Sequence, residues 1–583
     1  MAATDSAGRA WVAWQGYRDG RLQILTSAEQ GPTSTVPGFT PEAVVSTSQR
    51  SSWDPAIAAA PNGEVAIGWD TYDKGDYDVY LRRVHLTNGV TMEAPIPVAT
   101  TPNFEARASI VYNSASVLWI GYEVSGPLWG KDYGAYDSSG TPLYQNHTIQ
   151  VRFVVGNTVY APSDDVSRVL AGQASGLMVP VCPGPTQTQG TPPATGCATV
   201  TPLTQPNPQL ALTRAANSGL PRVQGLANSF PRLATDGSAI YLAYRVFNGL
   251  GTSTGAATGQ TVGSIWSEQL VYFDISRWHG PGIFADSDGL LDNRPAMLPM
   301  AAGRMLIAQA MDHRLSPLRK GTPKRDGVDS DIYALELQVP VSPPVTGLPP
   351  GSPAPASPGA PTAETTAELA AAAVLNDYRT NVSGQTMRLM RGDFHRHTEL
   401  SFDGHADGAL VDAYRYGIDG AKMNWFSCCD HDNGGAREYS WWLAQKYTDA
   451  YLLGNAFVPV FYYERSLGYP RGHRNVMFEK RGIRPLPRLP LQKGSVSQPD
   501  TQWLYSYLSF FGKTPYNNRG RTAAHTSATD QGTDWGDNNQ SLEPMVEIYQ
   551  GDRQSYEACP DVSGEPCKLM PAIWVSPIWV TYQ

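Results

Sequence analysis

The chain has 583 residues, a formal net charge of -9 and only 17% charged residues. This length exceeds what one hydrophobic core usually covers, so two or more domains are expected. The acidic balance and the lack of a run of Lys and Arg argue against a basic stripe for nucleic acid. No stretch of about 18 apolar residues is present, so no membrane span is expected. Abundant glycine, proline, Trp and Tyr favour a β-rich architecture.

The N-terminus lacks the charged and apolar regions of a secretory leader, so we expect either a removed leader or a fragment. Two pairs of cysteines each close a short loop and predict local disulfides, Cys182–Cys197 and Cys559–Cys567. Such disulfides indicate an oxidising location, periplasmic or secreted, while free thiols in the cytosol are the alternative. Cys428 and Cys429 lie in an apolar run and are expected to be buried.

Residues 1–340 repeat a hairpin pattern. Each unit has a short apolar strand, a tight Asn/Asp/Gly/Ser turn and a second strand that ends in an aromatic or apolar residue. Five units are clear, beginning at Asp5, Asp54, Arg107, Pro231 and Arg294. Three aromatic residues occupy equivalent ends at a spacing of roughly 50 residues, namely Trp14, Trp69 and Tyr122. This period of strand-only units predicts a β-propeller, with six or seven blades once the long interval before Tyr244 is included.

These units resemble sialidase-like and TolB-like propeller repeats, although no full Asp-box is present. The resemblance implies a structural or binding role with a glycan or protein partner. A glycosidase site would need two converging carboxylates. Residues 341–384 are predicted to form a Pro/Ala-rich linker and an Ala-rich helix, followed by a second domain over 385–583.

In the second domain strands and helices alternate, which predicts a parallel β/α architecture. His, Asp and Glu gather where the strands end, which fits an active site at the carboxyl edge of a β/α barrel. His395 and His397 are two apart on an extended chain, so both point to the same side and can share one ion. Five of the ten histidines follow this pattern: His395, His397, His431, His473 and His525. Taken singly, each would more often be structural, but imidazole with carboxylate suits Zn²⁺, Mn²⁺ or Fe.

As an ordered set, these residues resemble the PHP family, the polymerase and histidinol phosphatase superfamily of metal-dependent phosphoesterases. The motifs are "HRH" followed by an acid, a strand ending in Asp-His, a Glu at the end of the next strand, and "GHRNV". The downstream "EPMVEIYQGDRQSYE" is similar to a large bacterial subgroup related to carbamate hydrolases. The resemblance covers about residues 387–560 and implies a distorted (β/α)7 barrel, either complete or truncated.

The resemblance also implies a cluster of two or three divalent ions, Zn, Mn or Fe, with Glu464 as a bridge. The implied metal ligands are His395, His397, Asp403, His431, Glu464, His473 and His525. Asp430 and Glu464 receive the catalytic roles, with Asp430 orienting His431 or a water. The family's late Asp-x-His pair has no counterpart after His525. Either a segment is missing or the site has fewer ligands.

The main functional expectation is hydrolysis of a small-molecule phosphate ester by water that clustered cations acidify. Arg465 and Arg474 flank the ligands and are expected to fork onto the phosphate, with solvated surface arginines as the alternative. A second hypothesis keeps the site and replaces the substrate by a carbamate or carboxyl ester. A third is a propeller that binds a glycan or protein beside a degenerate second domain. The missing pair and the many Trp and Tyr residues favour the third.

Overall fold

The structure is a computed structural model that forms two compact units. Unit 1 comprises Met1–Gly251, Ser264–Lys324 and Val328–Glu368, and unit 2 comprises Thr252–Gly263, Arg325–Gly327 and Leu369–Gln583. The division falls inside helix α3 (Ala363–Asp377), within the predicted linker. The structure describes all residues except 32–37, 131–140, 142, 144–146, 171–179, 184–197, 200–227, 253–260, 302, 312–330, 340–344, 346, 357–359, 402–407, 429, 433–436, 466–472, 487–499, 526–537, 547–548, 551–552, 555–578 and 582–583.

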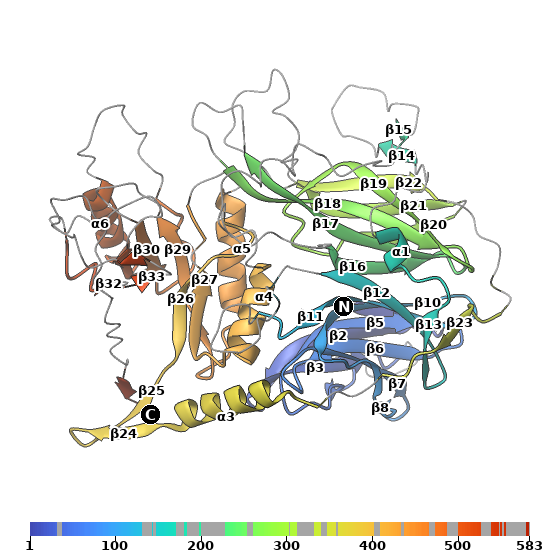
Figure 1. The fold of residues 1–583 in the computed structure, drawn as a ribbon, viewed down its shortest axis with the longest axis horizontal. Coiled ribbons are helices and arrows are strands. Elements are labelled where there is room, and N and C mark those ends of the chain that lie inside the picture. Colours follow the sequence, from blue (N-terminus) through green and yellow to red (C-terminus); the bar gives the residue numbers. More distant parts are fainter. Residues whose placement is uncertain are drawn as a thin grey trace. The chain divides into compact units, whose positions relative to one another are not determined.

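Unit 1 contains five sheets among its described residues (Figure 1). Sheet 1 holds β1 (Ala2–Thr4), β2 (Ala10–Arg18), β3 (Arg21–Ala28) and β4 (Ala43–Val44). Sheet 2 holds β5 (Ser52–Ala59), β6 (Val65–Thr71), β7 (Asp78–Leu86), β8 (Val90–Met92) and β9 (Ile96–Ala99). Sheet 3 holds β10 (Asn103–Tyr112), β11 (Leu118–Pro127), β12 (Thr148–Val155), β13 (Thr158–Pro162) and β23 (Gly351–Pro353).

Sheet 4 holds β16 (Asn228–Thr235), β17 (Ile240–Thr252), β18 (Thr261–Phe273) and β19 (Trp278–Gly289). Sheet 5 is ordered β15 (Ala198–Thr199), β14 (Pro180–Pro183), β22 (Asp331–Gln338), β21 (Arg304–Met311) and β20 (Ala296–Met300). A short helix, α1 (Ser167–Leu170), follows sheet 3. The long interval before Tyr244 therefore does not form a blade of its own in the described residues. Its strands β14 and β15 extend sheet 5 instead, so five sheets lie in the described residues. The six or seven blades stay a prediction, because 171–179, 184–197 and 200–227 lie outside the description.

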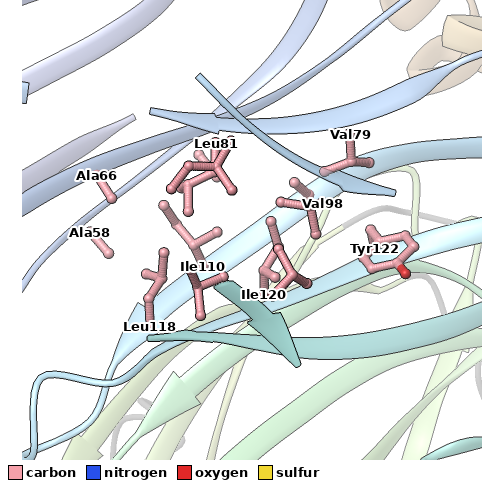
Figure 2. Packing of buried hydrophobic residues seen from close by; sticks show 14 of the residues in the cluster. Ala58, Ala66, Val79, Leu81, Val98, Ile110, Leu118, Ile120 and Tyr122 are labelled. Atoms are coloured by element: carbon pink, nitrogen blue, oxygen red, sulfur yellow. The ribbon is translucent and has the colours of Figure 1, made fainter. Parts of the chain in front are cut away.

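Consecutive sheets of unit 1 pack on one another, which makes the unit propeller-like as predicted. Strand β6 is buried at every residue because its sheet has a neighbour on each face. Figure 2 shows the cluster between sheets 2 and 3, where Leu81 and Val98 meet Ile110 and Ile120. The other three clusters join sheets 1 and 2, 3 and 4, and 4 and 5, and are built around Trp11 and Trp69, Trp119 and Phe273, and Tyr241 and Met305.

A repeated β-bulge begins sheets 2, 3 and 4, each with a shift of strand register. The bulge residues are not glycine, yet their φ is positive: 45° at Asp54, 54° at Arg107 and 54° at Phe230. This conformation is uncommon for such side chains, so the surroundings must hold it.

A side chain of the preceding sheet holds each bulge by accepting a hydrogen bond from its backbone. We name this contact the bulge latch, and it repeats three times: Gln15 Oε1 with Asp54 N (3.2 Å), Asp70 Oδ2 with Arg107 N (2.8 Å) and Glu123 Oε1 with Phe230 N (2.5 Å). The acceptors directly follow Trp14, Trp69 and Tyr122, which confirms that these aromatic positions are equivalent.

Unit 2 contains short sheets and helices. The first sheet pairs β24 (Arg379–Val382), β25 (Gln385–Leu389) and β35 (Trp579–Thr581) antiparallel, and the second pairs β26 (Gly392–Arg396), β27 (Trp425–Cys428) and β28 (Val458–Pro459) parallel. The third holds β29 (Phe461–Arg465), β30 (His473–Phe478), β31 (Gly520–His525) and β32 (Met545–Val546), and the last holds β33 (Tyr549–Gln550) and β34 (Arg553–Gln554). The helices are α4 (Leu410–Arg415), which continues into a π-helical turn η1 (Tyr416–Gly420), α5 (Arg437–Ala450) and α6 (Asp500–Phe511).

The expected parallel (β/α)7 barrel is wrong for the described residues of unit 2. Strands β29, β30 and β31 pair antiparallel, and only β26–β28 and the β31–β32 pair are parallel. The physical reason lies in the chain length between Arg465 and His473. A parallel crossover needs about a dozen or more residues, whereas only 466–472 separate β29 from β30. These two strands must therefore form a hairpin.

The described residues test only some of the predictions about cysteines and membrane spans. Cys428 is buried, as predicted, while Cys429 lies outside the described residues. The two predicted disulfides also involve residues outside the description, so both stay predictions. In the part of the chain that the structure describes, no helix combines the length and the apolar character needed to cross a bilayer.

Candidate metal centre

Four strands of unit 2 bring the predicted ligands together. His395 lies near the end of β26 and His397 just beyond it, while His431 follows the adjacent parallel strand β27. His431 also forms a parallel β-bridge with Glu464 of β29. His473 begins β30, the antiparallel neighbour of β29. The ends of two different sheets therefore meet around Glu464.

The carboxylate of Glu464 faces a different pair of imidazoles with each oxygen. Oε2 lies 3.5 Å from His395 Nε2 and 3.3 Å from His397 Nε2. Oε1 lies 3.5 Å from His431 Nδ1 and contacts His473 Nδ1. Each oxygen thus combines with two nitrogens to form one three-ligand group, and Glu464 belongs to both groups.

These separations fit two ligands on one ion. Metal–ligand bonds of about 2.0–2.1 Å in a tetrahedral site place neighbouring ligand atoms about 3.3–3.4 Å apart. The three nitrogen–oxygen distances of 3.3–3.5 Å match that edge. Four imidazoles and one carboxylate also form the mixed nitrogen and oxygen donor set that first-row transition metals prefer. Three of the four histidine–carboxylate pairs therefore fit ligands of divalent cations bridged by Glu464, while His473 Nδ1 contacts Oε1 directly.

The imidazole rings pack against one another around this carboxylate. The His397 and His431 rings stack with centroids 4.7 Å apart, and His395 and His473 approach them edge-on. The Glu464 side chain is only 1% exposed, whereas those of His397 and His473 are 15% and 14% exposed. The carboxylate is thus enclosed while the outer imidazoles reach solvent, which leaves a path for an ion.

Neighbouring polar groups hold the ligands in place. Asp393 Oδ1 accepts a hydrogen bond from His395 N (2.8 Å). The Asp430 carboxylate accepts hydrogen bonds from Thr398 N (2.6 Å) and Thr398 Oγ1 (2.9 Å). Asp430 thus fixes the turn that follows His397, and its expected role in orienting His431 or a water stays a prediction.

Sequence reasoning missed Ser401 and Thr398. Both are fully buried, and Ser401 Oγ lies 3.3 Å from His397 Nδ1 and 3.2 Å from His431 N. Neither residue type has a metal-ligand pattern of its own. The sequence feature that could have identified them is their position in the segment 392–405, which also holds His395 and His397. A hydroxyl buried there needs a hydrogen-bond partner.

The two arginines expected to bind substrate are instead buried in contacts with other protein groups. Arg465 and Arg474 are 0% and 1% exposed, so they are not solvated surface residues either. Arg474 Nε donates to Glu543 Oε2 (2.8 Å), and Arg465 donates to Asp432 Oδ2 (3.5 Å) and to the Leu486 carbonyl. Each arginine directly follows a ligand on a strand, so its side chain points to the opposite face. This alternation is the physical reason for the correction.

Two further predicted ligands are only partly placed. Asp403 lies outside the described residues, as does His405. The backbone of His525 lies directly opposite His473 in the β30–β31 pair, which puts it at the same sheet end. The side chain of His525 is outside the description, so its role as a ligand stays a prediction.

A small cavity of about 30 Å³ borders the centre. Its wall includes Asp430, His431 and Asp432 on one side and Trp441 and Tyr462 on the other. A site of this size holds one or two water molecules. Water can therefore sit beside His431 and within reach of carboxylates.

No family model and no curated protein matches the chain. Solved structures do align with it. A polysaccharide lyase of family PL25, an ulvan lyase, is 9% identical over 54% of this chain and 67% of its own, with a TM-score of 0.28. An endo-arabinase from Bacteroides thetaiotaomicron is 8% identical over 58% and 91%, with a TM-score of 0.27. A Trypanosoma rangeli sialidase in complex with sialic acid is 7% identical over 58% and 54%, with a TM-score of 0.23.

These findings correct the resemblance to the PHP family. No family model supports it, and the aligned structures are sialidase, arabinanase and polysaccharide-lyase folds. The antiparallel β29–β30–β31 arrangement agrees with this correction. The narrower assignments that came with the resemblance, a phosphoesterase and a zinc site, are withdrawn with it.

Proposed function

We propose that unit 2 is a metal-dependent hydrolase whose two divalent cations are bridged by Glu464. The observation that carries the proposal is the division of the Glu464 carboxylate, with one oxygen facing His395 and His397 and the other facing His431 and His473. Bound cations of this kind act as Lewis acids that acidify water and polarise a carbonyl. The protein's part is to fix the ligands and to exclude competing geometries.

The carboxylates near His431 supply the remaining chemistry. Asp430 and Asp432 line the small cavity beside His431, where a carboxylate would accept a proton from an attacking water. Asp430 accepts two hydrogen bonds from Thr398 and Asp432 accepts one from Arg465, so either carboxylate would take this proton while it keeps its contact.

The substrate is best sought among carbonyl compounds such as carboxyl esters and carbamates. A phosphate ester would need cationic side chains for its charge. The two arginines beside the ligands already contact protein groups, Glu543 and Asp432, on the opposite strand faces. A neutral carbonyl substrate needs no such clamp.

Metal content and turnover of the full chain test the proposal together. We expect two equivalents of Mn²⁺ or Co²⁺ per chain, and hydrolysis of an aryl acetate or aryl carbamate that a chelator abolishes and added metal restores. p-Nitrophenyl phosphate should turn over more slowly than either. A chain that binds no Mn²⁺ or Co²⁺ and hydrolyses none of these substrates would overturn the proposal.

A second candidate function is carbohydrate binding by unit 1. A cavity of about 180 Å³ lies between sheets 3 and 4, lined by Trp119, Phe273, Asn113 and Ser238 among others. The Trp119 indole Nε1–H is buried, and it has no hydrogen-bond partner among the described residues. Aromatic faces with a few polar groups suit a sugar ring, whose hydroxyls would accept from this indole.

Glycan-array binding of the full chain tests this candidate. If a glycan occupies the cavity, Trp119→Phe should keep the aromatic face, lose the indole donor and weaken binding by roughly fivefold, the value of one hydrogen bond. The variant Trp442→Phe, at an exposed tryptophan of α5, serves as the matched control and should bind as wild type. An array without any bound glycan, or equal binding by both variants, counts against the candidate.

A further inference from the structure

The turn that follows His397 connects the two halves of the candidate metal centre. Ser401 N donates to the Thr398 carbonyl (3.0 Å), which closes the turn. Thr398 in turn donates twice to Asp430, the residue before His431. Glu464 N donates to the Asp430 carbonyl (3.1 Å). One short segment is therefore tied to both histidine groups and to the bridging residue.

The hydroxyl of Ser401 lies between the two groups. Its Oγ accepts a hydrogen bond from His431 N (3.2 Å) and lies 3.3 Å from His397 Nδ1. A hydroxyl oxygen has two acceptor sites. With one taken by His431 N, the other can accept from Nδ1–H of His397.

This contact bears on which nitrogen of His397 carries the proton. A neutral imidazole carries its proton on one nitrogen and offers a lone pair on the other. If Nδ1 donates to Ser401, Nε2 carries the lone pair, and Nε2 is the atom 3.3 Å from Glu464 Oε2. Partners of the second nitrogen commonly fix metal-ligating histidines in this way.

We infer that Ser401 is a positioning residue that sets the His397 tautomer and links the two cation positions. The inference rests on the proposed function, because it assigns a role toward the same pair of ions. It goes beyond that function by assigning a role to a residue outside the predicted ligand set, and by predicting unequal effects on the two positions.

Cobalt titration of the full chain tests the inference. We expect Ser401→Ala to weaken one Co²⁺ equivalent by roughly 10- to 100-fold, the loss typical of an outer-shell partner, with a changed visible spectrum for that equivalent. The second equivalent should be affected less. Ser427→Ala is the matched control, because Ser427 is also buried but its hydroxyl donates to the Val460 carbonyl. This control should bind both equivalents as wild type.

A second measurement reads the tautomer directly. Long-range proton–nitrogen spectra of the chain loaded with diamagnetic Cd²⁺ and labelled with ¹⁵N-histidine report which nitrogen of each histidine carries the proton, and we expect His397 to carry its proton on Nδ1. A proton on Nε2 would overturn the inference, as would unchanged cobalt affinities and spectra in Ser401→Ala. Failure of the wild-type chain to bind cobalt or Cd²⁺ would instead contradict the proposed function.

Discussion

Replacing Glu464 with glutamine should release both metal ions rather than one. Each oxygen of this carboxylate faces a separate histidine pair, so the amide removes the shared charge from both groups at once. We expect the Co²⁺ affinity of both equivalents to fall by more than about 100-fold, beyond the loss caused by an outer-shell partner. Calorimetric titration of the full chain measures both equivalents, and hydrolysis should disappear with them.

Two comparison variants test whether the loss of both ions is specific to the bridging carboxylate. His473→Ala removes a ligand from the Oε1 group only, so one equivalent should remain. Glu479→Gln changes an exposed glutamate just after β30 and should bind both ions normally. Retention of two tightly bound Co²⁺ ions by Glu464→Gln would show that the carboxylate is not the bridge.

Replacing Glu123 with glutamine should destabilise unit 1 by about 3–5 kcal/mol, the cost of breaking a buried ion pair. Glu123 receives two hydrogen bonds from Arg107, at 2.8 and 2.7 Å, and also holds the bulge at Phe230. Both charged residues are at most 1% exposed, so the substitution leaves a buried guanidinium without its counter-charge. The shift of the unit 1 unfolding transition in scanning calorimetry measures the loss.

The first bulge latch provides the matched control. Gln15 holds Asp54 at the same register position but is neutral, so Gln15→Ala should cost only about 1 kcal/mol, the value of one hydrogen bond. Equal losses in the two variants would contradict the role assigned to the buried ion pair.

The same prediction has a pH dependence. Burial alone would raise the pKa of Glu123, but the charge of Arg107 and hydrogen bonds from His147 and Arg107 outweigh burial and hold it well below its usual range. A depressed pKa in the folded state stabilises the fold above the unfolded value, about 4.3 for glutamate. This contribution is lost as the pH falls below that value. The difference in unfolding free energy between Glu123→Gln and wild type should therefore be smaller in acid than at neutral pH.

Periodicity predicted the sheet-forming part of unit 1 because each strand buries apolar residues against a neighbouring sheet. The spacing of Trp14, Trp69 and Tyr122 predicts that they are equivalent, and a bulge latch directly follows each of them in the structure. The sheet that β14 and β15 join could not be predicted, because β22, the partner of β14, lies far along the chain and no local pattern specifies this pairing.

The candidate ligands were predicted because strand ends are marked by a change from apolar to polar residues. His395 and His397 indeed present both Nε2 atoms to one carboxylate oxygen, as their alternation requires. The same rule, applied to Glu464 and Arg465, would have excluded the arginine from the site. Strand direction was the harder problem: alternating elements suggest parallel strands, and only the short 466–472 connection indicates the hairpin.

The bulge latches also determine how a disturbance spreads through unit 1. Each latch joins one sheet to the next, so the coupling within the unit acts between nearest neighbours, as it does in repeat proteins. A substitution at Glu123 should destabilise sheets 3 and 4 first and leave the stability of sheet 1 unchanged. Of the three latches, the neutral one at Gln15 contributes least, so we expect the junction between sheets 1 and 2 to be weaker than the junctions held by Asp70 and Glu123.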